Sequence, residues 1–166
     1  MIYLVTVHDR NKKLSNLHTE KDLKSFCWKS ILELTVHKTV LYSSDSFNAF
    51  KNKALPNRVN IVFSKKTKGA QKITNVLVNN NYKDLVETFG GTKQDIYVLG
   101  LNHFLVERFA KDADFIIDYS TEEISRTTQG IFDTINFADY TLLKKQEHTH
   151  FDIRYFVREK TNYIGY

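Results

Sequence analysis

The chain has 166 residues, 42% of them hydrophobic and 13% aromatic, and carries a formal net charge of +5 at pH 7. This composition excludes a disordered chain, and the length suits a single domain, residues 1–166, with one sizeable core. The one cysteine, Cys27, excludes an internal disulfide framework and fits a reducing cytoplasm. No apolar run reaches transmembrane length, and Met1 leads directly into a predicted strand, so we expect a cytoplasmic protein without a membrane span.

The first half of the chain is predicted to alternate strands and helices. Apolar runs typical of strands lie at Ile2–Val7, Thr39–Tyr42 and Val59–Phe63. A polar loop, residues 8–18, follows the first strand, and Thr19 with Asp22 is expected to cap a helix that runs to about Leu34. That helix should bury Leu23, Phe26, Cys27, Ile31 and Leu34, with Trp28 near its edge. The run Ser43–Ser46 offers N-caps for a short helix to Phe50.

The second half continues the alternation and then changes character. A strand is predicted at Ile73–Val78, and a helix at Tyr82–Phe89 is ended by Gly90–Gly91. A further strand lies at Phe115–Tyr119. The alternating segments Tyr140–Lys145 and Phe151–Arg158 are typical of a hairpin with one solvated face. The predicted fold is therefore α/β, with a mostly parallel central sheet flanked by helices and a C-terminal antiparallel hairpin.

The stretch Gln94–Phe109 is the first candidate for a functional site. An uncharged run, Ile96–Leu99, predicts a strand buried on both faces, Gly100 ends it, and an amphipathic helix follows. A strand, a glycine turn and a helix present backbone N–H groups at the carboxyl end of a sheet, where nucleotide phosphates dock in open α/β sheets. The alternative is that Gly100 only turns the chain.

Two other polar features are assigned no site. The basic cluster Lys65, Lys66, Lys68 and Lys72 has no interleaved aromatic residues, so it favours a solvated loop over nucleic-acid binding. His148 and His150 flank Thr149 in the predicted hairpin turn without a nearby Cys or acidic cluster, and no metal site is indicated. Abundant Lys, Asn, Ile, Phe and Tyr suggest an AT-rich genome, as in a bacteriophage or a low-GC bacterium.

Over nearly its whole length the chain resembles the dihydrofolate reductase family. The most specific match is Leu55–Val62 (LPNRVNIV), which is similar to the family's Leu-Pro-Gly-Arg-x-Asn-Ile-Val. The other matching segments are MIYLVTVHDRNKKLS at the start, Lys38–Tyr42 with Ser46–Phe47, Tyr97–Gly100, Ala113–Ile117 and Phe151–Lys160. The resemblance implies a dihydrofolate-reductase-like fold, NADPH as cofactor and a folate-like substrate.

The resemblance leaves the catalytic acid undecided. The family holds the pterin with a carboxylate on the first helix, and the preferred, ungapped alignment puts Cys27 there. A thiol cannot make the two-point hydrogen bond of a carboxylate. With a loop five residues shorter, Asp22 becomes the acid and Phe26 a wall of the pocket; alternatively, Asp22 only complements the helix dipole. Asp118 aligns with the family's supporting threonine and is either a relocated carboxylate facing the same pocket or the polar end of an edge strand.

The cofactor motifs depart from the family as well. The family's Pro-Trp in the active-site loop is missing, and its Gly-Arg reads Ser43–Ser44, which removes the guanidinium that grips the adenosine phosphate. Its Gly-Gly reads Gly100–Leu101, where a leucine should crowd the ligand. The resemblance still implies Arg58 for a glutamyl carboxylate, Leu55 as a pocket wall and Ser46 as a hydroxyl near the cofactor.

Two hypotheses of function follow. The favoured one is a catalytically degenerate relative that binds a protein or nucleotide partner; the alternative is a working NADPH-dependent reductase that converts 7,8-dihydrofolate to tetrahydrofolate. Because the loop 8–18 carries Arg10, Lys12 and Lys13, we expect it to form, with Ser43–Asp45, a surface for an acidic protein partner. A merely solvated loop is the other interpretation.

Overall fold

The computed structural model describes residues 1–15, 22–64, 75–122 and 127–160. The predicted cap Thr19 and the lysine cluster of residues 65–72 lie outside the described residues. So do residues 73–74 of the strand predicted at Ile73–Val78.

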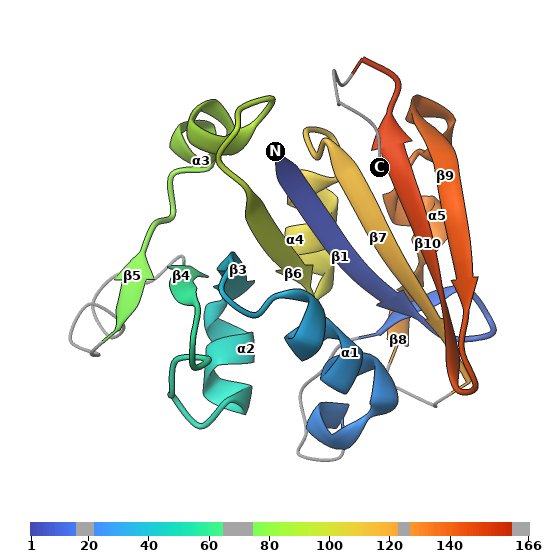
Figure 1. Ribbon diagram of the computed structural model, residues 1–166, viewed down its shortest axis with the longest axis horizontal. Helices are drawn as coiled ribbons and strands as arrows, with labels where there is room; N and C mark the ends of the chain where they lie inside the picture. The colour runs from blue at the N-terminus through green and yellow to red at the C-terminus, as the bar shows by residue number, and fades with distance from the viewer. Residues whose placement is uncertain (16–21, 65–74, 123–126, 161–166) are drawn as a thin grey trace.

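One mixed sheet forms the centre of the molecule (Figure 1). Its strands follow in the order β5 (Val76–Val78), β4 (Val59–Phe63), β3 (Thr39–Ser43), β6 (Ile96–Gly100), β1 (Ile2–His8), β7 (Phe115–Thr121), β10 (Phe151–Arg158) and β9 (Tyr140–Glu147). Neighbours from β5 to β7 are parallel, and β10 pairs antiparallel with both β7 and β9. The predicted fold class is confirmed: mostly apolar segments form the parallel strands, and alternating segments form the hairpin.

Helices cover both faces of this sheet, each over its own apolar cluster. On the face turned to the viewer in Figure 1 lie α1 (Phe26–Leu34) and α2 (Ser44–Ala49), whose buried side chains pack with Val5 and Val7 of β1. On the other face, α3 (Tyr82–Phe89), α4 (His103–Phe109) and α5 (Ile131–Thr134) pack with Ile2 and Leu4. Successive side chains of a strand point to opposite faces, so the two clusters are separated by the sheet itself.

The first helix begins later than the sequence suggested. Asp22–Lys24 forms a separate 3-10 turn (η1), and α1 starts at Phe26 because the Ser25 side chain caps it, accepting a hydrogen bond from the Trp28 amide at 3.2 Å. This register turns Cys27, Trp28 and Ile31 toward the sheet, whereas Phe26 is 45% exposed. The predictions that Phe26 is buried and that Trp28 lies at the helix edge were therefore wrong.

Several short elements were not predicted. The expected polar loop contains β2 (Lys13–Ser15), which pairs with β1 at His8↔Leu14 and with β8 (Thr127–Gly130). The pairing buries Leu14 in the cluster beneath α4. A 3-10 turn, η3 (Phe137–Asp139), leads into β9. These segments are too short for a periodic pattern; long-range pairing makes β2 and β8 regular, whereas the Asn136 side chain caps η3 locally.

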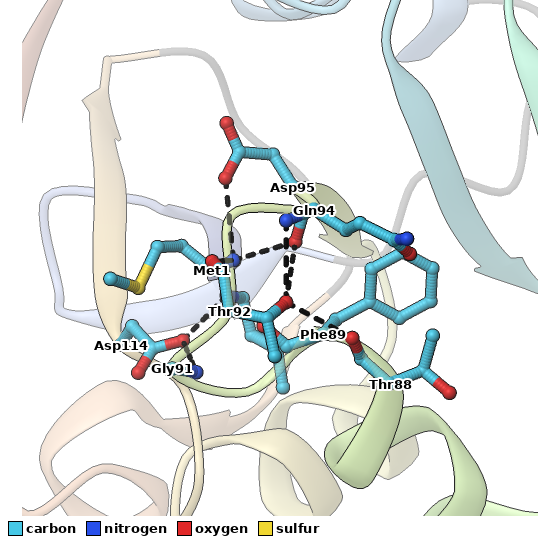
Figure 2. Close-up of polar contacts among 9 residues, drawn as sticks. Met1, Thr88, Phe89, Gly91, Thr92, Gln94, Asp95 and Asp114 are labelled. Atoms are coloured by element: carbon cyan, nitrogen blue, oxygen red, sulfur yellow. Dashed lines mark hydrogen bonds and ion pairs between the residues drawn. The ribbon is translucent and has the colours of Figure 1, made fainter.

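The beginning of β1 is fixed by polar contacts with the loop before β6 (Figure 2). The Met1 ammonium donates to the carbonyl oxygens of Thr92 and Gln94 at 2.7 and 2.6 Å and forms an ion pair with Asp95. The Asp114 carboxylate accepts from the amides of Ile2 and Gly91. These contacts set the register of β1 between β6 and β7.

Candidate functional site

The strands β3 and β6 form a topological switch point. They are adjacent and parallel, yet α2 after β3 packs on one face of the sheet and α4 after β6 packs on the other. Neighbouring strands whose helices leave to opposite faces open a crevice at their carboxyl ends, and open α/β sheets bind ligands in that crevice. The candidate site is therefore this edge of the sheet, where β1 also ends.

Three polar side chains at the switch point bind one another. Ser43 caps α2 and accepts from the Ser46 amide at 3.2 Å, while Asn102 caps α4 and accepts from the Leu105 amide at 3.0 Å. The Asn102 amide group donates to the Ser43 hydroxyl at 2.6 Å, and Ser43 in turn donates to the Ser46 hydroxyl at 3.3 Å. Ser46, the expected hydroxyl near a cofactor, is 1% exposed, so its side chain serves this network rather than the surface.

The glycine turn at the end of β6 is explained by close packing. A Cβ atom on Gly100 would lie 2.7 Å from the Val5 carbonyl oxygen and 2.7 Å from a Val106 methyl group, so the position requires glycine. Leu101, the residue expected to crowd a ligand, has no exposed surface and packs in the apolar cluster beneath α1 and α2. Gly100 therefore has a packing role, and the role in phosphate binding that the sequence suggested stays a prediction.

His103, the first residue of α4, was missed by the sequence analysis. Both of its ring nitrogens are shielded from solvent and have no hydrogen-bond partner among the described residues. Burial lowers the pKa of His103, and the nearby Glu107 carboxylate opposes that shift. The lowered pKa favours the neutral form of this imidazole, which follows the Asn102 cap in the chain. Its position just after the glycine turn was the sequence signal that could have drawn attention to it.

The acid position preferred by the alignment is closed and apolar. Cys27 is 1% exposed and lies in one cluster with Val5, Val7 and Leu101, none of which is more than 1% exposed. The Tyr119 hydroxyl, on which Cys27 acts electrostatically, is hydrogen-bonded to the Ser30 hydroxyl at 3.0 Å. Burial raises the pKa of Tyr119, so this hydroxyl stays neutral.

The two residues of the gapped alignment do not point toward the sheet from one helix: Asp22 lies outside α1, and Phe26 is its first residue. Asp22 lies in η1, before the Ser25 cap, where its backbone is in a separate turn. Phe26 stacks on the His150 ring of the hairpin turn, with ring centroids 3.9 Å apart, rather than facing the sheet. Any role of these residues in binding a substrate stays a prediction.

Asp118 lies on the opposite face of the sheet from Cys27. It has no exposed surface, and its carboxylate is bonded to the Thr6 hydroxyl at 2.8 Å, His8 Nδ1 at 2.9 Å and Arg154 Nη2 at 2.8 Å. Its strand β7 is an interior strand between β1 and β10, so the interpretation as an edge-strand end was wrong. The pleat directs residue 118 to the side of Leu4 and Ile116, whereas Ile117 and Tyr119 face α1. Asp118 and Cys27 therefore do not face a common pocket.

The segment with the most specific family match is tightly fixed. Asn60 accepts from the Tyr42 hydroxyl at 2.7 Å and from the Leu55 amide at 2.9 Å, and Leu55 is 9% exposed. The Arg58 guanidinium donates to the Thr35 hydroxyl at 3.1 Å, to the Pro56 carbonyl oxygen and to the Leu32 carbonyl oxygen. Partial burial lowers the pKa of Arg58. These contacts hold the planar guanidinium in one orientation beside the C-terminal end of α1.

No group of three or more His, Cys, Asp or Glu residues in the described part of the chain is placed to hold a metal ion. None of the described helices is long and apolar enough to cross a membrane.

The fold and the switch-point crevice define an open α/β protein with a C-terminal antiparallel hairpin. The family model for dihydrofolate reductase matches residues 5–160, and the chain belongs to this family. Among solved structures, it is similar to dihydrofolate reductase from Enterococcus faecalis complexed with NADP(H) and RAB-propyl. The TM-score is 0.76 at 16% sequence identity, with 96% of this chain and 97% of that chain covered. A search of curated proteins found no match. The resemblance inferred from the sequence is confirmed for family and fold.

Proposed function

We propose that this protein keeps the dihydrofolate reductase fold but does not reduce dihydrofolate, and acts instead by binding a protein or nucleotide partner. The observation that carries the proposal is the environment of Cys27. At the position where the resemblance expects a carboxylate, a thiol lies in the apolar cluster that contains Val5, Val7 and Leu101, and at most 1% of each of these residues is exposed. A pterin held by two hydrogen bonds needs a charged acceptor and open space, and this cluster offers neither.

The other candidate acids do not replace the missing carboxylate. Asp118 faces the opposite side of the sheet and is already bonded to three donors. Asp22 lies outside α1, in the turn that precedes it. Ser44 in place of an arginine also takes away the charge that would bind the adenosine phosphate of NADPH, since a hydroxyl makes a weaker bond to a phosphate than a guanidinium.

The alternative, a working NADPH-dependent reductase, is favoured by Arg58. Its guanidinium is held by Thr35, Pro56 and Leu32 in the segment that resembles the family most specifically. Such an orientation would suit the carboxylate of a folate-like substrate. In that case Asp22 would serve as the acid, and Gly100 and Leu101 would line the NADPH site.

A titration with NADPH and a turnover assay separate the two functions. Ligand at ~100 times its dissociation constant adds about 2.7 kcal/mol of stability, so a melting curve is a sensitive readout of binding. We expect no saturable NADPH shift and no consumption of NADPH on adding dihydrofolate, in the wild type or in Cys27→Ala. Turnover that Asp22→Asn abolishes and Cys27→Ala leaves intact would establish the reductase and refute the proposal. If NADPH shifts the melting temperature saturably but is not consumed, the partner is a nucleotide. The inference that the cofactor site is lost would then be wrong.

For a protein partner, we propose the surface formed by the loop after β1 and the start of α2. Arg10, Lys12 and Lys13 are exposed there, and Arg10 pairs with Glu122. Ser43 is buried in the cap network, so exposed Asp45 and half-buried Ser44 supply the polar side of this surface. Residues 16–18 of the expected loop lie outside the described residues. An acidic partner complements the basic side chains, which mainly set the rate of association and its dependence on salt.

A pull-down from host lysate tests this surface. Capture should be lost when Arg10, Lys12 and Lys13 are all changed to Glu. A charge-matched control changes three exposed lysines elsewhere, Lys83, Lys93 and Lys111, to Glu, and capture should persist. Identical captures by all three proteins, or none by any, would contradict the proposed surface.

A further inference from the structure

The imidazole of His103 lies where its charged form has no support. His103 is the first residue of α4, directly after the Asn102 cap, and the residue as a whole is half-buried. Both ring nitrogens are nevertheless shielded from solvent, and in the described part of the chain neither has a hydrogen-bond partner. Buried polar groups in native proteins are rarely left unpaired, so this arrangement calls for an explanation.

The surroundings of this ring oppose a positive charge. A cation at the beginning of a helix meets the positive end of the helix dipole and the free N–H groups of the first turn. Protonation would also give the ring a second shielded N–H donor without an acceptor. Of the titratable side chains on α4 and on this face of β1, β6 and α5, which pack against it, the Glu107 carboxylate acts on the ring and partly offsets the effect of burial. The remaining ones are His8, Arg108 and Asp133.

The residue before His103 joins two helices across the edge of the sheet. The Asn102 side chain caps α4 by accepting from the Leu105 amide, and it donates to the Ser43 hydroxyl at 2.6 Å. Ser43 ends β3 and caps α2 by accepting from the Ser46 amide. Because α2 and α4 pack on opposite faces of the sheet, this Asn102–Ser43 bond, the cap bridge, spans the switch-point edge.

We propose that protonation of His103 opens the cap bridge, so that the switch-point edge carries a pH-sensitive latch. While the ring is neutral, it keeps its shielded position, and the start of α4 stays bonded to Ser43. The imidazolium needs acceptors that this position lacks, and solvent and the Glu107 carboxylate supply them once the ring turns outward. Since Asn102 and His103 are consecutive, this movement displaces the cap of α4 and breaks its 2.6 Å bond to Ser43. The latch goes beyond the proposed partner binding and does not depend on it.

The pH at which the latch opens follows from the linkage between protonation and structure. While the bridge is closed, burial holds the pKa of His103 below its ordinary value of 6.5. In the open form the ring is solvated, so that form binds the proton more readily. The closed form therefore dominates above pH 6.5, and opening begins as the pH falls below that value. By the same linkage, breaking the bridge must make the ring easier to protonate.

An NMR titration of the full chain from about pH 8 to about pH 5.5 tests the latch. It follows the His103 ring and the side-chain amide protons of Asn102. These amide protons should move toward the shifts of a solvated amide, with the same midpoint as the His103 ring. In His103→Phe, which keeps a ring but cannot be protonated, and in His103→Gln, Asn102 should not respond. The matched control, His148→Gln, removes an exposed histidine of the hairpin turn and should respond like the wild type.

Two neighbouring serines test the coupling from the other helix. Ser43→Ala removes the acceptor of the bridge, so the midpoint of the His103 ring titration should rise toward 6.5. Asn102→Ser, which keeps a capping oxygen but removes the amide donor, should have the same effect. Ser44→Ala, next to the bridge but not part of it, should leave the midpoint unchanged. Circular dichroism establishes that each variant is folded.

Four results would overturn the proposal. They are an Asn102 amide that does not respond to pH in the wild type, a response that persists in both His103 variants, a response that is lost in His148→Gln, and a His103 midpoint that is the same in the wild type, Ser43→Ala and Asn102→Ser.

Discussion

Replacing Asp118 by alanine is expected to destabilise the protein strongly without affecting any ligand. The carboxylate has no exposed surface, and three donors bind it: Thr6, His8 and Arg154. The Arg154 side chain is only 28% exposed. Removing one partner of a buried ion pair costs about 3–5 kcal/mol, because the remaining charge and donors lose their acceptor. For a chain of this length, that loss corresponds to a melting temperature lower by roughly 6–20 °C.

Urea unfolding measures this loss directly. The single tryptophan, Trp28, is 4% exposed, so its fluorescence reports its release from the core, and circular dichroism checks that the transition has two states. Thr6→Val is the matched control and should cost about 1 kcal/mol, the value of one hydrogen bond. A cycle with Arg154→Met should give a coupling free energy of about 1–3 kcal/mol.

Two results would refute this reasoning. If Asp118→Ala costs no more than Thr6→Val, the carboxylate is not the centre of the network. If instead Asp118→Asn unfolds like the wild type but loses dihydrofolate turnover, then Asp118 acts on a substrate, and its placement across the sheet from Cys27 would not decide its role.

Two further predictions follow from the switch-point edge. Gly100→Ala should destabilise the protein by about 1–3 kcal/mol, because its Cβ would lie 2.7 Å from the rigid Val5 carbonyl oxygen. The control, Gly91→Ala, lies at φ +66° with open space around it and should cost roughly 1 kcal/mol. Equal losses of stability in the two variants would contradict the packing argument. Burial lowers the pKa of His103 below its ordinary value of 6.5, so the unfolded chain binds the proton more readily and stability should fall as the pH drops below about 6.5. Urea unfolding at several pH values should show that the free energy of unfolding falls less steeply at low pH in His103→Gln than in the wild type. The same pH dependence in both proteins would count against a lowered His103 pKa.

The elements with strong local patterns were predictable from the sequence. The helix Tyr82–Phe89 has the predicted bounds, since Asn81 supplies a side-chain cap and Gly90–Gly91 follows its last turn. The strand Val59–Phe63 also has the predicted bounds, because a β-branched and aromatic run, with Asn60 as its one polar residue, enters the sheet directly after the Leu55–Arg58 turn. The same segment carried the family resemblance, and the side chains of Asn60 and Arg58 fix it in place through hydrogen bonds.

Tertiary structure decided which face each candidate side chain meets. The sequence shows that Asp118 is a charge in an apolar strand, but only the pairing of β7 with β1 and β10 places it beside Thr6, His8 and Arg154 and across the sheet from Cys27. A shift of one residue would reverse that assignment, because side chains alternate between faces. The stacking of the Tyr3 ring on those of Tyr97 and Phe115 likewise depends on the registers among three strands that are far apart in the chain. Local propensity decides where most strands and helices form, whereas the long-range register of the strands decides which side chains meet.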